Sequence, residues 1–209
     1  MSSTRLPGKN MLTFHRADMI EYVLQGALKS KLIDKVIIAL PDEEDVKPIV
    51  EKYKEFAYIC KGIPVNDLLS RYYHTIKRFK YNPINVIRLT SDCPLLRFYY
   101  KEIDKVIHHH IKNGYDFTHN RGKNGAPSGI DVEVMKYEVL KASFEFAGPD
   151  EREHVTTWIK KNSSVFKIQD IPSAFTFKWK WSIDTQEDFD RVEDVFKLIE
   201  MRKFLYETK

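Results

Sequence analysis

The sequence predicts an α/β fold built on a mostly parallel central sheet. Up to Gly114, short apolar, β-branched runs alternate with amphipathic segments of helical period. At that spacing each apolar run is typical of a buried strand, and each amphipathic segment is typical of the helix that crosses back over the sheet. Such strand–helix–strand connections are right-handed and place successive strands in parallel.

The first element is a helix over residues 19–33, in which Ile20, Val23 and Leu24 share one face. Asp18 followed three residues later by Glu21 is typical of an N-cap and its return contact. The next elements alternate: strand 35–40, helix 42–55, strand 56–60, helix 65–80, strand 84–89 and helix 97–113.

After Gly114 the alternation is less regular. Strands are expected at 115–120, 130–135, 165–171 and 179–183, and helices at 136–147, 151–161 and 187–207. The Gly- and Pro-containing segment NRGKNGAPSGI is the one obvious loop of any length, and we expect it to line a substrate pocket.

Composition narrows the class of protein. The chain has 209 residues, 43% of them hydrophobic, and no linker divides it, so a single domain over residues 1–209 is expected. The net charge of +4 comes from interspersed acidic and basic residues, which disfavours a nucleic-acid partner. No apolar stretch is long enough to span a membrane, and Cys60 and Cys93 have no metal-ligand spacing, so a cytoplasmic protein is expected.

Polar residues beyond the ends of two predicted strands form the candidate site, since ligands bind open α/β sheets at the carboxyl ends of the strands. Asp92 follows the strand over residues 84–89, and Asp184 follows the strand over residues 179–183. The opening segment SSTRLPGK adds hydroxyl and basic groups. Because Mg²⁺ takes few carboxylates and fills its octahedron with water and phosphate oxygens, these residues are suited to hold magnesium and a triphosphate.

Both aspartates also have a structural interpretation, because an aspartate after a strand often caps the following helix. The local pattern leaves both interpretations open at Asp92 and favours the cap at Asp184.

Five segments occur in an order typical of one family: MSSTRLPGK, RLTSDCPLL, SGIDVEV, EREHVT and WSIDTQEDF. The chain thereby resembles, over nearly its whole length, the family named for the spore coat polysaccharide protein SpsF, which belongs with the acylneuraminate and Kdo cytidylyltransferases. The resemblance implies a three-layer nucleotide-diphospho-sugar transferase fold, similar to GT-A. It also implies an enzyme of polysaccharide or surface-glycan biosynthesis that converts a nucleoside triphosphate, usually CTP, and a sugar acid into a CMP-sugar and pyrophosphate.

The resemblance also implies roles for individual residues. Arg5, Lys9 and Asp92 would act in catalysis, and Asp92 and Asp184 would hold Mg²⁺. The nucleotide would be bound by Ser2, Ser3, Thr4, Arg5, Lys9 and Arg88. The sugar would be bound by Asp131, Glu133, Arg152, Glu153 and His154. His154 is the best candidate for a general base, and a homodimer is expected by analogy with relatives.

Two departures from the family pattern stand out. The segment FHRADMI replaces the usual Gly-x-Pro turn, which affects nucleobase recognition. Relatives also have an apolar strand ahead of MSSTR. We therefore expect the natural protein to have an extra N-terminal strand of roughly five to six residues. Without that strand, a gap between residues 36–40 and 85–89, or another strand filling it, is expected.

Two other function classes compete. A glycosyltransferase that uses a nucleotide-sugar would release no pyrophosphate, and it typically carries Asp-x-Asp where this chain has SDCP. The third class is a catalytically weak relative.

Overall fold

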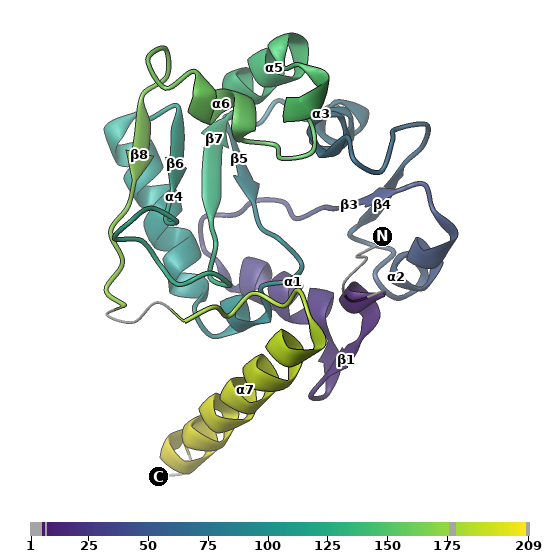
Figure 1. Ribbon diagram of the computed structural model, residues 1–209, viewed down its shortest axis with the longest axis vertical. Helices are drawn as coiled ribbons and strands as arrows, with labels where there is room; N and C mark the ends of the chain where they lie inside the picture. Colours follow the sequence, from purple (N-terminus) through teal and green to yellow (C-terminus); the bar gives the residue numbers. More distant parts are fainter. Residues whose placement is uncertain (1–5, 7, 176–178, 208–209) are drawn as a thin grey trace.

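The computed structural model describes residue 6, residues 8–175 and residues 179–207 (Figure 1). The strands are β1 (Thr13–Phe14), β2 (Ala17–Asp18), β3 (Ile38–Pro41), β4 (Ala57–Cys60), β5 (Asn85–Arg88), β6 (Phe117–His119), β7 (Glu133–Lys136) and β8 (Ile168–Asp170). The α-helices are α1 (Met19–Lys29), α2 (Lys47–Lys52), α3 (Leu68–Arg78), α4 (Tyr100–Asn113), α5 (Tyr137–Phe146), α6 (Thr157–Lys161) and α7 (Gln186–Glu207). Short 3-10 helices are η1 (Lys9–Met11), η2 (Glu44–Val46), η3 (Pro94–Arg97) and η4 (Pro149–Glu151).

The central sheet has the strand order β5–β7–β6–β8 and is covered by helices on both faces. Successive residues of a strand point to opposite faces. On β7, Val134 belongs to a core cluster with Ile107 of α4. Its neighbour Met135 packs in a second cluster with Leu69 of α3 and Leu140 of α5. This layering confirms the α/β fold class.

The sheet is mixed rather than mostly parallel. β3 pairs with β4 in parallel, as does β6 with β8, but β7 is antiparallel to both β5 and β6. The reason lies in the connection, because the loop from β6 to β7 contains no helix. Without a crossover helix the chain returns in the opposite direction.

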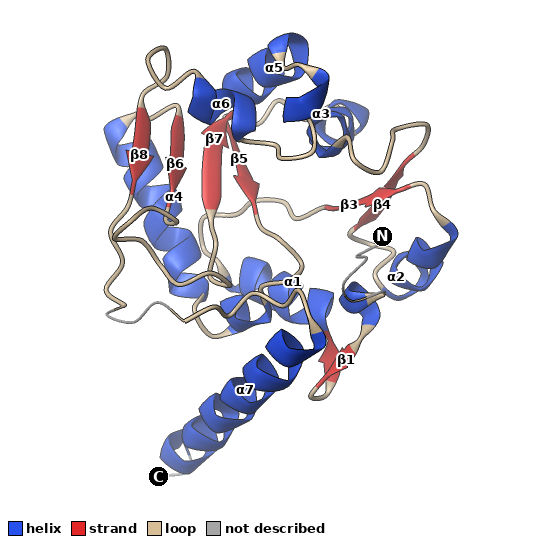
Figure 2. Ribbon diagram, in the orientation of Figure 1, coloured by secondary structure: helices blue, strands red, loops and turns tan. Residues whose placement is uncertain are grey.

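The pair β3–β4 forms a sheet of its own, set apart from the central sheet (Figure 2). Its core cluster joins Leu40 of β3 to Ile20 and Leu24 of α1 and to Ile49 of α2. β3 and β5 do not pair, and a cavity of about 660 Å³ lies between them. Among the described residues, the gap expected between residues 36–40 and 85–89 is therefore present.

The first half of α7 is anchored to a hairpin near the start of the described chain. β1 and β2 are joined by a tight turn in which His15 has a φ of 59°. The backbone N–H of His15 donates to Glu193 Oε1 at 3.0 Å, and Phe14 packs on Phe196 with ring centroids 5.1 Å apart. Segment FHRADMI thus forms a hairpin that docks α7, whose C-terminal end extends away from the body (Figure 1). None of the described helices is both long and apolar enough to cross a membrane.

Candidate active site

The structure brings Lys9, Asp92 and Asp184 together. The Lys9 Nζ atom lies 3.5 Å from Asp92 Oδ2 and 3.4 Å from Asp184 Oδ1. It also donates to the carbonyl oxygen of Ile183 at 3.0 Å. Two carboxylates far apart in the sequence therefore face one cation, and both remain about a quarter exposed to solvent.

Backbone hydrogen bonds hold the two carboxylate-bearing segments against each other. The N–H of Ile183 donates to the carbonyl oxygen of Asp92 at 3.0 Å. The N–H of Trp181 donates to the carbonyl oxygen of Ser128 at 2.5 Å. Residues 179–183, predicted as a strand, are irregular here. Hydrogen bonds to two loops, at Asp92 and Ser128, hold this segment in place of the ladder of a neighbouring strand.

Asp184 does not supply the cap of α7. Thr185 does, since the N–H of Asp188 donates to Thr185 Oγ1 at 3.2 Å and the N–H of Thr185 donates back to Asp188 Oδ2 at 3.2 Å. This is the reciprocal arrangement of a capping box. At the other segment η3 begins at Pro94 without a side-chain cap. Neither Asp92 nor Asp184 thus supplies a helix cap, and both carboxylates face Lys9.

Neighbouring cations keep Asp184 ionised. Lys180 Nζ lies 3.0 Å from Asp184 Oδ2, on the side opposite the contact with Lys9. Burial alone would raise the pKa of Asp184, but Lys180 and Lys9 outweigh burial and hold this pKa below its usual value. Asp184 is therefore ionised at neutral pH.

The donor set fits a hard divalent cation. Three oxygens, from Asp92, Asp184 and the Ile183 carbonyl, surround the Lys9 ammonium at 3.0–3.5 Å. Within the described residues, no group of three or more His, Cys, Asp or Glu side chains lies close enough together to hold a metal ion by itself. A set of two carboxylates and one carbonyl oxygen could hold Mg²⁺, which fills the rest of its octahedron with water and phosphate oxygens.

Asp131 lies directly behind the carboxylate pair. The Cys93 Sγ atom is 3.8 Å from Asp131 Oδ2 and 3.5 Å from Asp92 Oδ1. Burial raises the pKa of Asp131 to about 6, although Arg121, whose Nη1 donates to Asp131 Oδ2 at 3.2 Å, opposes this rise. Asp131 is therefore a carboxyl group that gains a proton only slightly below neutral pH.

The loop over residues 120–130 packs against the same site. Ser128 Oγ is 2.8 Å from Ser182 Oγ. Gly129 has a φ of +106°, and a Cβ at this position would lie 2.2 Å from the carbonyl carbon of Trp181. Only glycine allows so close an approach, so Gly129 sets the distance between the loop and the Asp184 segment.

Glu133 and Arg88 form a buried network at the start of β7. Arg88 Nη1 donates to Glu133 Oε2 at 2.7 Å, while Thr156 Oγ1 and Lys160 Nζ contact Glu133 Oε1 at 3.1 and 3.0 Å. Burial alone would raise the pKa of Glu133, but Arg88 and Lys160 hold it below its usual value. These side chains thus join β5, β7 and α6.

Arg152 engages a different set of residues. It forms an ion pair with Asp67 (Nε to Oδ2, 2.9 Å) and donates to Ser70 Oγ at 2.7 Å and to the Phe144 carbonyl at 3.1 Å. These contacts tie the turn before α6 to α3 and α5, which lie at the top of Figure 1, whereas α7 starts below the sheet.

The remaining predicted residues contribute less to the site as described. Glu153 and His154 have exposed side chains. Ser2, Ser3, Thr4 and Arg5 lie outside the described residues, so their expected roles stay predictions.

Sequence reasoning missed Arg121 and Lys180. The sequence could have indicated both residues, because Arg121 lies in the predicted substrate loop and Lys180 is four residues before Asp184.

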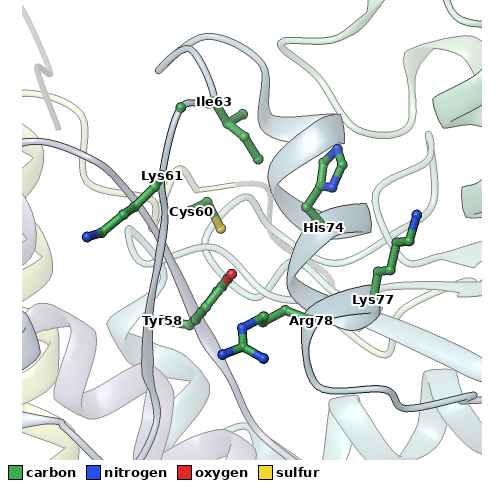
Figure 3. A pocket seen from close by; sticks show the side chains of 8 residues that line it. Tyr58, Cys60, Lys61, Ile63, His74, Lys77 and Arg78 are labelled. Carbon is green, nitrogen blue, oxygen red and sulfur yellow. The ribbon is translucent and has the colours of Figure 1, made fainter.

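A separate concavity of about 430 Å³ lies between β4 and α3 (Figure 3). Its lining includes Tyr58, Lys61, His74, Lys77 and Arg78, and no residue of the predicted site. We therefore do not place the reaction there.

Comparison with known proteins gives consistent matches. A family model described as Cytidylyltransferase matches residues 1–209. The structure of a cytidylyltransferase from Leptospira borgpetersenii serovar Hardjo-bovis (strain JB197) is 27% identical, with a TM-score of 0.80 over 91% of this chain and 80% of that chain. An uncharacterized protein of Methanocaldococcus jannaschii, MJ1063, is 28% identical over 198 residues, which are 90% of this chain and 76% of that protein.

The fold is also shared with a more distant enzyme. CMP:2-keto-3-deoxy-manno-octonic acid synthetase, solved in complex with CTP, is 14% identical, with a TM-score of 0.69 over 94% of this chain and 95% of that chain.

Proposed function

Because this chain belongs to the cytidylyltransferase family, we propose that it transfers the cytidylyl group of CTP to a sugar acid, giving a CMP-sugar and pyrophosphate. That the chain is a nucleotidyltransferase follows from the family. The sugar-acid acceptor, the SpsF-like subtype and a role in polysaccharide or surface-glycan biosynthesis are the proposal. The convergence of Lys9, Asp92 and Asp184 is the observation that carries it.

The proposed reaction is an in-line displacement. A hydroxyl oxygen of the sugar acid attacks the α-phosphorus of CTP, the bond from this phosphorus to the oxygen bridging to the β-phosphate breaks, and pyrophosphate leaves with that oxygen. The hydroxyl proton is released to solvent or to a base. Positioning of the reactants and neutralisation of phosphate charge account for most of the catalysis in such reactions.

Asp92 and Asp184 would hold magnesium in this scheme. Mg²⁺ would supply positive charge for the phosphate oxygens. Lys9, whose ammonium contacts both carboxylates, would bind the triphosphate together with Arg5.

We assign the acceptor side of the cleft to Asp131 and Arg121. Asp131 lies next to Asp92 across Cys93, and the Arg121 side chain is half exposed, so its guanidinium can reach a carboxylate of the acceptor. The remaining charged residues would support the site indirectly, by holding β5, β7 and α3 together: Arg88, Glu133 and Arg152. Nucleotide contacts by Ser2, Ser3 and Thr4, and acceptor contacts by Glu153 and His154, remain predictions.

A homodimer and a cytoplasmic location complete the proposal. The second half of α7 presents Leu198, Met201 and Leu205, all more than half exposed, along one side of the helix. We propose that this stripe packs against its copy in a second chain.

The experiment that tests the proposed function is pyrophosphate release, measured with each nucleoside triphosphate against a panel of nonulosonic acids and Kdo, in the presence of Mg²⁺. We expect release with CTP that depends on one sugar acid. Asp92→Asn and Asp184→Asn should each lower kcat by at least about 100-fold while leaving the fold intact, because the lost charge acts mainly on the reacting phosphates.

Asp194→Asn is the matched control, since the Asp194 side chain is 78% exposed on α7 and should leave kcat unchanged. Sugar transfer from a nucleotide-sugar without pyrophosphate release would contradict the proposal. Pyrophosphate release that is insensitive to both site variants would contradict the assigned site.

A further inference from the structure

We propose that the concavity between β4 and α3 binds a diphosphate group, at a place separate from the site of Lys9, Asp92 and Asp184. The concavity measures about 430 Å³, which corresponds to roughly fourteen water molecules at about 30 Å³ each. A compact anion such as a diphosphate fits within this volume. The proposal concerns a second ligand site and does not depend on the reaction assigned to the first.

The lining of the concavity carries positive charge. Lys61 belongs to the turn after β4, while Lys77 and Arg78 belong to the last turn of α3. No Asp or Glu is among the described residues that line it. Figure 3 shows Lys61 and Lys77 on opposite sides of the concavity and Arg78 beside Tyr58. Because a hollow lined by charge of one sign concentrates the electric field and attracts counter-ions, this lining matches an anion with several charges.

The three cations have no anionic partner within the fold. Across the part of the chain that the structure describes, the side chains of Lys61 and Arg78 form no hydrogen bond or ion pair. Lys77 lies 5.8 Å from the centre of the Tyr73 ring and pairs with no described carboxylate. The dipole of α3 favours cations in its last turn, but it does not account for Lys61, which lies outside that helix. An anion in the concavity would supply the counter-charge.

Neutral hydrogen-bond donors line the same concavity. Figure 3 shows the Tyr58 hydroxyl pointing into the space between β4 and α3, and no described residue hydrogen-bonds to it. The backbone N–H groups of Gly62 and Ile63 likewise donate to no described acceptor. Gly62 has a φ of 71°, and successive N–H groups around a left-handed residue are typical of anion-binding turns. These donors would bind phosphate oxygens beside the cations.

Contacts between β4 and α3 hold the concavity open at a fixed width. The Cys60 Sγ atom lies 3.1 Å from Thr75 Oγ1 and 3.7 Å from the carbonyl oxygen of Arg71, and Cys60 is buried. The Tyr58 ring packs edge-on against Phe79, with ring centroids 5.3 Å apart. The walls are therefore in place before a ligand enters, which reduces the cost of ordering them on binding.

The number and type of charges favour phosphate over a single carboxylate. A carboxylate carries one negative charge, whereas a phosphate group carries nearly two at neutral pH and a diphosphate carries more. The Arg78 guanidinium suits phosphate, which it can bind through two parallel hydrogen bonds, and lysine ammonium groups act as point charges for it. Free pyrophosphate and the diphosphate of a nucleotide both have this chemistry.

The test is a titration of the isotope-labelled complete chain with inorganic pyrophosphate, followed by the chemical shifts of assigned backbone amides. The amides of Lys61, Gly62 and Ile63 should shift in a saturable way, with a Kd below about 1 mM at low salt. The titration is run in EDTA and without an acceptor sugar, so its outcome is independent of whether the chain transfers cytidylyl groups. Shifts assigned to single residues also separate this concavity from the segments around Asp92 and Asp184.

Variants of the lining residues should weaken the binding of pyrophosphate. In Lys61→Gln/Arg78→Gln the Kd should rise about tenfold or more, because charge-assisted hydrogen bonds to phosphate are lost. Tyr58→Phe should raise the Kd about threefold, the effect of one neutral hydrogen bond. Lys101→Gln/Lys112→Gln is the matched control, since it removes two exposed lysines of α4 and the same net charge. It should leave the Kd within about twofold of wild type, because charges remote from the ligand are screened by salt.

The absence of saturable shifts at these amides up to about 10 mM pyrophosphate would overturn the proposal. An equal loss of affinity in the two double variants would also overturn it, because that result indicates non-specific attraction of anions. A parallel titration with CDP identifies the source of the diphosphate. Binding of CDP at least about tenfold tighter than pyrophosphate supports a nucleotide ligand at this site, and any smaller difference supports free pyrophosphate.

Discussion

At the scale of single residues, two aspartates of the candidate site have different environments. Asp184 faces two lysines, and its pKa lies below the usual value although burial opposes this shift. Asp131 is 7% exposed, and burial raises its pKa to about 6. Burial penalises a charge, while a nearby cation stabilises it, so the balance of these effects sets the protonation of each group.

Asp131→Asn should therefore change how stability depends on pH. Between the ordinary pKa of 3.8 and about 6, the folded wild type holds a proton that the unfolded chain has lost, so wild-type stability falls as pH rises through this window. Asn has no proton to lose. The free energy of unfolding of the variant relative to wild type should rise by up to about 3 kcal/mol between pH 4 and pH 7, as measured by urea denaturation.

Asp116→Asn provides a control of opposite sign. Burial works to raise the pKa of Asp116, but Lys136 and the N–H of Lys167 outweigh it and lower this pKa. The ionised group thus stabilises the fold above its unfolded pKa, and that contribution is lost as pH falls. The variant should be less stable than wild type at pH 7 and approach it at low pH; equal pH profiles for the two variants would refute this account.

At the scale of elements, the contact between α1 and η3 positions Asp92. Gly26 of α1 lies against η3 so closely that a Cβ would be 2.7 Å from the carbonyl oxygen of Leu96. Such a distance to backbone cannot be relieved by a rotamer change. The glycine thus lets the helix and the segment after Asp92 share one core with Tyr22 and Leu95.

Gly26→Ala should lower the free energy of unfolding by about 1–2 kcal/mol. The helix gains up to about 1 kcal/mol in propensity, but overpacking costs about 1–3 kcal/mol or somewhat more against rigid backbone. Activity should fall as well, because η3 can move only together with Asp92. Thermal unfolding and pyrophosphate release measure the two effects.

Gly148→Ala is the matched control. A Cβ at Gly148 would meet Glu151 Oε2 at 3.8 Å, which is an ordinary contact, so stability should change by no more than about 0.5 kcal/mol. A Gly26→Ala protein as stable as wild type would show that α1 and η3 separate without cost.

At the scale of the whole molecule, the second half of α7 leaves an apolar stripe uncovered. Leu198, Met201 and Leu205 follow the spacing i, i+3, i+7 and are 60%, 56% and 57% exposed. Residues at this spacing share one helix face. The first half of the same helix buries Val192 and Phe196 completely against the body of the protein. The apolar stripe of the second half is exposed to solvent.

Met201→Glu should convert the proposed dimer to a monomer, because a carboxylate in an apolar interface loses its hydration without gaining a partner. Sedimentation equilibrium across a concentration series measures the change. Ile111→Glu, which alters a 57% exposed apolar residue on α4, should leave the dimer intact. A wild-type protein that is monomeric at all concentrations would exclude this interface.

Much of the fold and part of the site follow from the sequence. The alternation of apolar runs and amphipathic segments predicts the α/β class, because strand and helix periods depend only on local geometry. Strand-end geometry likewise predicts that Asp92 faces the cleft. The resemblance to the family also led us to expect that β3 and β5 would not pair.

Only the tertiary structure shows which residues the polar side chains of the site bind. Local pattern favoured a cap at Asp184, and only the fold shows that Thr185 makes the cap while Asp184 meets Lys9 and Lys180. The sequence pattern also did not predict that β7 runs antiparallel to β5 or that Arg152 pairs with Asp67. Hydrogen bonds and ion pairs between distant segments depend on how layers pack in three dimensions, whereas periodicity reports only which side of its own element a residue occupies.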